Sequence, residues 1–267
     1  MGDALPHGTP PAPAVDGVLF DLDDTLLDLR TAQLAAFAGT VRRQWPDAPE
    51  DGSSSFAAAA EHFASDAAGH YQRYVTGELD FAGQRMARAA DALALLGASG
   101  GLAIPRRELW VDDYEGLVRT HWALFDDVLP AVAAFRAAGV GVGIVTNNVE
   151  AYQRGKADAL GLQDVTVLIG SDTAGAPKPD PAPFLEGCRR LGTEPARTVC
   201  VGDSLSHDVR GAAAAGLVPV WLRRPAVETV TTAGAGDPVA ACPAWDAEAG
   251  AWRIAGLSEL AAWLPQG

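Results

Sequence analysis

Five short apolar runs are spaced unevenly along the chain, and this spacing limits the folds that it can adopt. The runs occupy residues 18–20, 140–145, 165–169, 198–201 and 217–222. Periodic or Ala-rich stretches separate the last four runs, as the β-α-β units of a parallel sheet require. Roughly a hundred residues separate the first run from the second, which is far too long for one crossover connection. The spacing therefore predicts an α/β fold, a Rossmann-like parallel-sheet core with a large insertion after its first strand.

The insertion has helical periodicity. Apolar residues recur three or four positions apart, as at Leu34, Phe37 and Val41, so one face of each helix is expected to pack in a core. We expect its aromatic residues to serve this packing and not to bind a cofactor. The predicted organisation is a flexible tail, 1–14, a core domain in two parts, 15–28 and 122–267, and an α-helical cap domain, 29–121.

Local signals mark further elements of the core. Asp180 followed by proline predicts the start of a helix, and Gly192 predicts its end. Beyond the fifth run, a stretch rich in Thr, Gly, Ala and Pro predicts a long loop to residue 243. A strand at 252–255 and a closing helix at 257–264 follow, and the sequence indicates no role for the loop.

Charge restricts the class of partner. The net charge is −14 and the isoelectric point is near 4.6, whereas nucleic acids and anionic membranes attract basic surfaces. Only two lysines occur, Lys156 and Lys178, against eighteen arginines. No apolar stretch approaches the length of a membrane span. We therefore expect no nucleic-acid or membrane partner, and a small anionic substrate would need local positive charge.

Cysteine usage and the first residues bear on localisation. The three cysteines form no C-x-x-C motif, which suits a reducing compartment. Residues 1–14 contain neither a basic start nor an apolar segment of signal-peptide type. We expect a cytoplasmic protein that is a monomer or a homodimer.

Polar residues follow three of the predicted strands. The segments read FDLDDT at 20–25, VTNN at 145–148 and VGDSLSHD at 201–208, and APKPD at 176–180 precedes the predicted helix. In an open parallel sheet, ligands bind beyond the carboxyl ends of the strands. These segments are therefore expected to meet in one crevice.

The residue types in this crevice indicate a cation and an anion. Two carboxylates about 4 Å apart repel each other by roughly 4 kcal/mol at an effective dielectric constant of 20. A cluster of acids therefore favours a bound cation, and hard carboxylate oxygens suit Mg²⁺, which in turn binds phosphate oxygens. A lysine and a threonine in the same crevice would balance the remaining phosphate charge.

In these segments the sequence resembles the haloacid dehalogenase (HAD) superfamily. Its phosphatases carry D-x-D-x-T, then a Ser or Thr, then a Lys, then G-D-x-x-x-x-D. The corresponding residues here are Asp21 to Thr25, Thr146, Lys178, and Gly202 to Asp208. Each element alone is a weak signal, but the ordered set at strand ends is specific. A helical insertion directly after the first motif also resembles the type I cap of this superfamily.

The resemblance implies a role for each site residue. Asp21 would be the nucleophile, forming an aspartyl phosphate, and Asp23 the general acid and base. The phosphate-binding groups would be Thr146, the amide of Asn147 and Lys178. The magnesium ligands would be Asp21, the backbone carbonyl of Asp23, Asp203, and Asp208 as a second ligand or as a partner of the ligands.

Four other charged residues are expected to have no role in the site. Asp24 and Asp28 are interpreted as solvated loop acids or hinge residues. Arg85 and Arg88 lie in the insertion, where solvated helix faces account for most arginines.

The expected function is magnesium-dependent hydrolysis of a small phosphorylated metabolite, and three alternatives remain open. Haloalkanoic acid dehalogenases share the fold but need no magnesium and generally lack the second Asp of the first motif, here Asp23. A capped phosphomutase would use the same residues, so product analysis must separate it. A non-catalytic binding protein is disfavoured, because buried like charges are costly to keep without a use.

Overall fold

The computed structural model of the chain describes residues 9–96, 107–225 and 242–264. The chain forms two compact units. One comprises Met1–Leu27 and Leu124–Gly267 and is called the sheet unit here; the other, Asp28–Ala123, is called the helical unit. Part of the expected tail, residues 1–8, and most of the expected loop, residues 226–241, lie outside the described residues.

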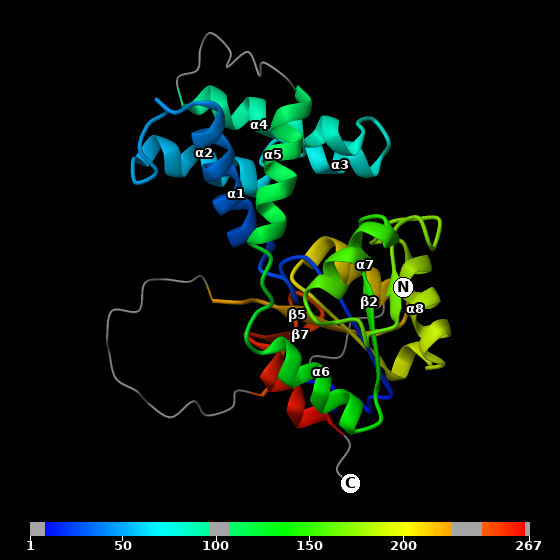
Figure 1. Cartoon of the computed structure of the whole chain (residues 1–267). Coiled ribbons are helices and arrows are strands. Elements are labelled where there is room, and N and C mark those ends of the chain that lie inside the picture. Colours follow the sequence, from blue (N-terminus) through cyan, green and yellow to red (C-terminus); the bar gives the residue numbers. More distant parts are fainter. Residues whose placement is uncertain (1–8, 97–106, 226–241, 265–267) are drawn as a thin grey trace, which may run out of the picture. The chain divides into compact units, whose positions relative to one another are not determined.

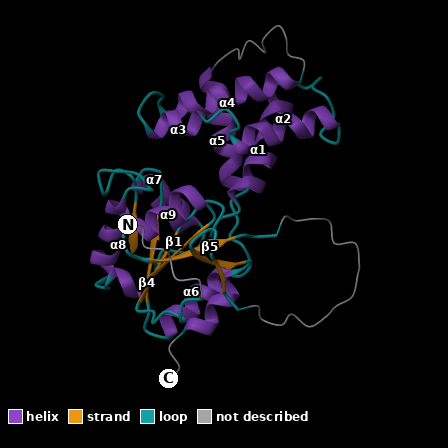
Figure 2. Cartoon of the chain, turned by 180° about the vertical axis from the view of Figure 1, so that it is seen from behind, coloured by secondary structure: helices purple, strands orange, loops and turns teal. Residues whose placement is uncertain are grey.

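In the described part of the sheet unit, seven strands form one sheet in the order β3-β2-β1-β4-β5-β7-β6 (Figures 1 and 2). Neighbouring strands are parallel except β6 and β7, which are antiparallel. The bounds are β1 Gly17–Phe20, β2 Gly141–Val145, β3 Val167–Ile169, β4 Thr198–Gly202, β5 Val218–Leu222, β6 Ala244–Asp246 and β7 Ala251–Ile254. The predicted α/β fold with a parallel-sheet core is confirmed. The sequence does not predict β6, whose three residues are too few to show an alternating pattern.

Helices cover both faces of this sheet. Leu19 and Phe20 are consecutive in β1 and so point to opposite faces. Leu19 packs in one cluster with Phe184 of α8, whereas Phe20 contacts Phe135 of α6 with ring centroids 6.1 Å apart. Figure 2 shows α6 and α9 on opposite sides of the strands. The helices of this unit are α6 Val128–Ala137, α7 Glu150–Ala159, α8 Pro181–Leu191, α9 Arg210–Ala214, and the shorter or irregular turns η1 Pro195–Arg197, η2 Leu205–Val209 and η3 Leu257–Trp263.

Helix α8 has the ends that the sequence predicts. The Asp180 side chain accepts a hydrogen bond from the amide of Ala182, so it satisfies a donor that the helix leaves free. Gly192 ends the helix with φ of 71°, in the left-handed region that glycine adopts without a steric penalty. This capping fixes where the Lys178 loop ends and the helix begins.

The helical unit has its own core. Its helices are α1 Leu29–Gln44, α2 Ser54–Ser65, α3 His70–Val75, α4 Phe81–Leu95 and α5 Arg107–Thr120. Phe37 contacts Phe63 and Trp110, with ring centroids 5.1 and 6.0 Å apart, so the aromatic residues pack as predicted. In the described part of the chain, none of the helices is both long and apolar enough to cross a bilayer.

The interpretation of Arg85 and Arg88 as solvated is wrong, because both are buried in the helical unit. Arg88 donates to the carbonyl of Phe63 at 2.9 Å, and Arg85 forms an ion pair with Glu115. Their partners come from other helices of the unit. The two arginines therefore help to hold this helical core together.

Candidate active site

The carboxyl ends of β2, β1 and β4 bring three of the predicted segments together. Phe20 pairs with Ile144 on one side and with Val201 on the other. The strands are parallel and in register, so Asp21 lies level with the last residues of β2 and β4. Thr146 and Asp203 each follow one residue later.

Lys178 lies between two of the predicted carboxylates. Its Nζ donates to Asp21 Oδ1 at 2.7 Å, to Asp208 Oδ1 at 2.6 Å and to the carbonyl of Val145 at 3.1 Å. Burial alone would lower the pKa of this lysine, but the Asp208 and Asp21 carboxylates outweigh burial and raise its pKa. Lys178 is therefore a fixed positive charge in the crevice.

Asn147 holds the Lys178 loop in place. Its side-chain Oδ1 accepts from the Lys178 amide at 2.6 Å, and its Nδ2 donates to the Lys178 carbonyl at 2.9 Å. The sequence predicts a phosphate-binding role for the backbone amide of Asn147, and its side-chain contact was not foreseen. Spacing alone gives no signal for it, because the contact depends on how two loops meet.

Three carboxylates converge next to Lys178. One oxygen from each of Asp21, Asp203 and Asp208 lies within 4.8 Å of the other two. Desolvation, followed by the nearby Asp208 and Asp203 carboxylates, raises the pKa of Asp21 against the opposing effect of Lys178. Desolvation and the carboxylates of Asp208 and Asp24 likewise raise the pKa of Asp203 to about 7. Negative charge is thus in excess here, which is the condition that a bound cation relieves.

Two hydrogen bonds hold the last motif, and one of them orients the Asp208 carboxylate. The Ser204 amide donates to Asp208 Oδ2 at 3.0 Å, and the Trp221 indole donates to the carbonyl of Asp203 at 2.9 Å. A Cβ at position 202 would lie 2.2 Å from the Asp208 carboxylate, so only glycine fits there. This contact explains why the last motif needs Gly202.

Asp23 lies in a different environment from Asp21. Lys156 Nζ donates to both of its carboxylate oxygens, at 2.7 and 2.9 Å, and Gln153 Nε2 donates to one of them at 3.0 Å. Gln153 Nε2 also donates to Thr146 Oγ1 at 2.7 Å. The sequence pattern does not predict Lys156 and Gln153 as neighbours of the site. The rarity of lysine was the one available signal for Lys156.

Asp24 of the first motif and Asp28 just beyond it have structural roles. Asp28 caps α1, because its Oδ1 accepts from the Thr31 amide at 3.0 Å. Asp24 has φ of 60°, and its backbone amide donates to the Leu27 carbonyl at 2.7 Å. Asp28 is therefore a helix cap, and Asp24 forms part of a tight turn.

A comparison of sequences assigns the family. Residues 15–216 match the sequence profile of the haloacid dehalogenase-like hydrolase family. The chain belongs to this family. The resemblance found in the motifs is thereby confirmed, as is the prediction that the protein is a hydrolase.

Two curated relatives of this haloacid dehalogenase-like hydrolase are phosphatases. It is 31% identical to a phosphoglycolate phosphatase of Thiobacillus denitrificans over 76% of its own length and 80% of the relative's. It is 39% identical to a glyceraldehyde 3-phosphate phosphatase of Methanopyrus kandleri over 38% of its own length. The second match spans 43% of the Methanopyrus kandleri protein, less than half of its length.

Solved structures support the fold of this hydrolase. The magnesium-bound HAD-hydrolase YfnB from Bacillus subtilis is 22% identical and superposes with a TM-score of 0.66, over 94% of this chain and 98% of that one. The defluorinating L-2-haloacid dehalogenase Rha0230, also 22% identical, superposes with a TM-score of 0.65 over 94% of this chain and 95% of that one. Similarity of fold therefore does not separate a phosphatase from a dehalogenase, and side-chain chemistry must do so.

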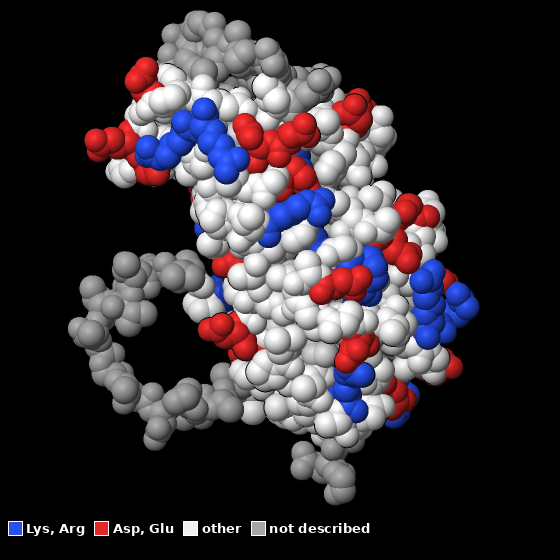
Figure 3. Space-filling model, viewed as in Figure 1, with Lys and Arg blue, Asp and Glu red and all other residues white. Residues whose placement is uncertain are grey.

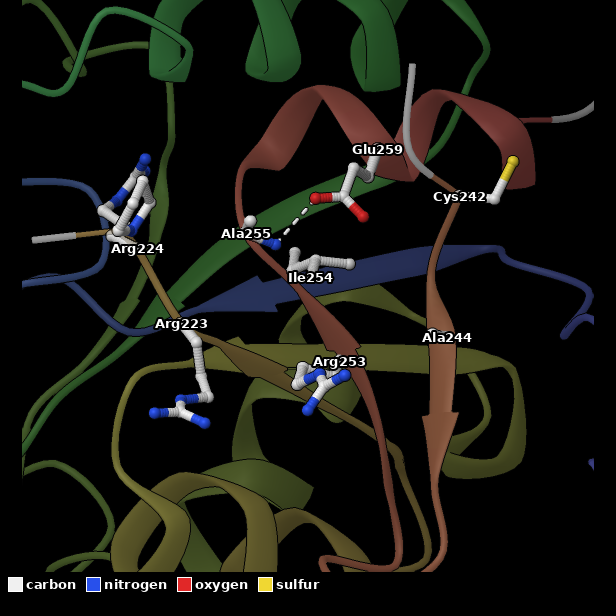
Figure 4. Close-up of a pocket in the computed structure, with 9 residues that line it drawn as sticks. Arg223, Arg224, Cys242, Ala244, Arg253, Ile254, Ala255 and Glu259 are labelled. Carbon is white, nitrogen blue, oxygen red and sulfur yellow. Dashed lines mark hydrogen bonds between the residues drawn. The ribbon is translucent and has the colours of Figure 1, made fainter. Parts of the chain in front are cut away.

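A cavity of about 490 Å³ lies away from these residues, at the ends of β5 and β7 (Figure 4). Arg224 lines it but bonds both oxygens of Asp127 and the carbonyl of Thr25. Glu259 lines it too, and accepts from the amides of Ala255 and Gly256 at 2.7 and 3.2 Å. None of the predicted site residues lines this cavity, so it is not the candidate active site.

Proposed function

We propose that this hydrolase is a magnesium-dependent phosphatase that cleaves a small soluble phosphate monoester through an aspartyl phosphate. One observation carries the proposal: the carboxylate of Asp21, whose side chain is 11% exposed, lies beside both a buried ammonium and two further carboxylates. When a carboxylate attacks phosphorus, positive charge nearby stabilises the transferring phosphoryl group. A metal ion at the same place needs the oxygens of the two further carboxylates as ligands.

The proposed roles follow the positions of the side chains. Asp21 attacks phosphorus, and the bond from phosphorus to the ester oxygen breaks. Asp23 gives its proton to that oxygen, so an alcohol leaves. Water then attacks the aspartyl phosphate and gives a proton to Asp23, which releases inorganic phosphate and restores Asp21.

One cation and two neutral hydrogen-bond donors would hold the phosphoryl group during both steps. Lys178 is directed to the nucleophile, and the hydroxyl of Thr146 follows β2 at the same edge of the sheet. We assign Lys178, Thr146 and the backbone amide of Asn147 to the phosphoryl oxygens.

The donor set fits magnesium. Ligand oxygens on one Mg²⁺ lie at most about 4.2 Å apart, since each Mg–O bond is about 2.1 Å. The 4.8 Å limit on the three carboxylate oxygens is close to this distance, so small side-chain movements would suffice. We assign Asp21, Asp203 and Asp208 as side-chain ligands and the backbone carbonyl of Asp23 as another. When bound, the ion would neutralise the excess carboxylate charge and polarise the phosphate.

The helical unit is proposed to act as a cap that limits substrate size and excludes bulk water. On the face that Figure 3 shows, basic and acidic side chains are interspersed and form no continuous basic band. Such a surface does not suit a polyanion. The substrate we propose is a small phosphorylated metabolite, with phosphoglycolate and glyceraldehyde 3-phosphate as first candidates from the relatives' names. We further propose a cytoplasmic monomer or homodimer.

Phosphate release from a panel of small esters tests the function. The panel contains phosphoglycolate, glyceraldehyde 3-phosphate, a sugar phosphate, a nucleotide and p-nitrophenyl phosphate, each with magnesium and then with a chelator. We expect magnesium-dependent release of phosphate that the Asp21→Asn variant lacks. A return of the phosphoryl group to the sugar would indicate a mutase, and chelator-resistant release of halide from a 2-chloro acid would indicate a dehalogenase. Either result would overturn the proposal.

A further inference from the structure

Two residues of α7 reach across the fold to the first motif. Lys156 donates to both oxygens of Asp23, and Gln153 bonds both Asp23 and the hydroxyl oxygen of Thr146. Gln153 and Lys156 are three positions apart on α7, so their side chains lie on the same face of the helix. They are 0% and 2% exposed, respectively. One helical turn therefore holds the proposed proton donor and a proposed phosphate ligand together.

Fold stability alone gives a poor account of these two buried polar residues. A buried ion pair is weak evidence for stability, since apolar replacements of similar volume are often neutral or stabilising. Burial of Gln153 also costs folding free energy, because its Oε1 has no hydrogen-bond partner among the described residues. When Asp23 is ionised its oxygens only accept hydrogen bonds, and Nε2 of Gln153 then faces it. Its Nε2 donates two hydrogen bonds, one to Asp23 and one to Thr146.

The arrangement orients the groups at both ends of the network. Lys156 and Gln153 fix the plane of the Asp23 carboxylate, whose side chain is still 25% exposed and accessible to a substrate. At Thr146, the oxygen already accepts a bond from Gln153, so its own proton is available to an acceptor elsewhere. An anionic phosphoryl oxygen is such an acceptor.

We propose that Lys156 and Gln153 are positioning residues, which aim the Asp23 carboxyl at the leaving oxygen and the Thr146 hydroxyl at the phosphoryl group. This proposal rests on the proposed function, because it needs Asp23 to transfer a proton. Misplacement of a reacting group by about 1 Å costs roughly 100-fold in rate. Loss of either residue should therefore lower kcat more than it changes KM.

The test compares four variants with the wild-type enzyme. Lys156→Met removes the ammonium, Lys156→Arg keeps a cation, and Gln153→Met removes both amide bonds. Arg154→Met is the matched control, because Arg154 lies on the same helix and its replacement also removes a cation. Its guanidinium bonds Asp158 and the carbonyls of Val165 and Leu162, at 2.9, 2.7 and 3.0 Å, and makes no bond to Asp23.

Each variant is assayed with an alkyl phosphate and with p-nitrophenyl phosphate, and its thermal midpoint is measured. We expect Lys156→Met to lower kcat for the alkyl ester by about 100-fold, with KM changed by less than about threefold. The nitrophenolate burst should fall by about tenfold or less, because that leaving group needs little help from an acid. Lys156→Arg should recover part of the loss, and Gln153→Met should lose about tenfold.

The control separates positioning from folding. Arg154→Met should lower the thermal midpoint while its kcat stays within about threefold of wild type. Lys156→Met could lose stability but keep kcat, or it could lose activity equally on the alkyl and nitrophenyl esters. Either result would make Lys156 a structural counter-ion and overturn the proposal. If the wild-type enzyme released phosphate from no ester, the proposed function itself would fail and this assignment would fail with it.

Discussion

Each of the two lysines of this chain pairs with aspartate, but the two regions differ in their balance of charge. Lys178 is shared by Asp21 and Asp208, with Asp203 close by, so carboxylates exceed cations there. Lys156 bonds both oxygens of the single carboxylate of Asp23. The first region has an excess of negative charge that a divalent ion would balance, whereas the second is a balanced pair. Two acids only two positions apart thus each pair with a lysine but differ in the number of carboxylates nearby.

The largest expected effect is on the first of these acids. Asp21→Asn should reduce phosphate release by at least about 10⁴-fold, because an amide does not attack phosphorus. Its stability in metal-free buffer should be unchanged or higher, since Lys178 keeps Asp208 and one excess charge is removed. Urea unfolding and phosphate assays on the same preparation measure both quantities. Strong destabilisation by Asp21→Asn would contradict an excess of negative charge around Lys178.

The second acid should respond differently. Asp23→Asn should lower kcat for alkyl phosphates by roughly 10²- to 10⁴-fold and affect the nitrophenolate burst less, because it removes a general acid. It should also destabilise the fold by about 1–3 kcal/mol, since Lys156, buried in α7, loses its charged partner. Asp21→Asn is the control for this stability change. Equal stability of the two variants would remove the distinction between the two regions.

The sequence predicts the first region well because topology determines it. Parallel strands of one sheet end at the same edge, so the residues directly after β1, β2 and β4 lie close together. The second region depends on which face of α7 turns toward the sheet, and a Gln and a Lys on a helix ordinarily indicate a solvated face. The buried Arg85 and Arg88 of the helical unit were misinterpreted for the same reason. Local pattern specifies strand ends, but it does not specify the partner of a polar helix residue.

The first region should make stability fall as pH rises toward neutrality. The pKa of Asp203 is raised to about 7, and that of Asp21 is raised in the same direction. In the unfolded chain the pKa of Asp is about 4. Between that pH and about pH 7, the folded protein keeps a proton that the unfolded chain has released. This contribution to stability is present below pH of about 4 and is lost as pH rises toward 7.

Magnesium should reverse that loss, because a divalent ion favours the carboxylate forms. At saturating magnesium we expect the thermal midpoint to rise by about 5 °C or more at pH 7.5 and to change little at pH 5. The measurement is a series of thermal melts with magnesium and with a chelator across this pH range. Asp203→Asn should flatten the pH dependence, whereas Gln153→Met should leave it unchanged. Equal stabilisation by magnesium at both pH values would contradict a site made of these carboxylates.

The smallest expected effect concerns an acid of the same segment that bonds neither lysine. Asp28 caps α1 through the Thr31 amide, and helix caps of this kind contribute about 1 kcal/mol. Asp28→Ala should therefore destabilise the protein by about 0.5–2 kcal/mol, while Asp28→Ser, which keeps a capping oxygen, should recover most of that loss. Neither change should alter the leaving-group dependence that marks Asp23. Urea unfolding of both variants, with kcat for alkyl and nitrophenyl esters, measures this. If Asp28→Ala reproduced the selective loss of alkyl ester hydrolysis, proton transfer could not be assigned to Asp23 alone, and the contrast between the two lysine regions would have to include the start of the helical unit.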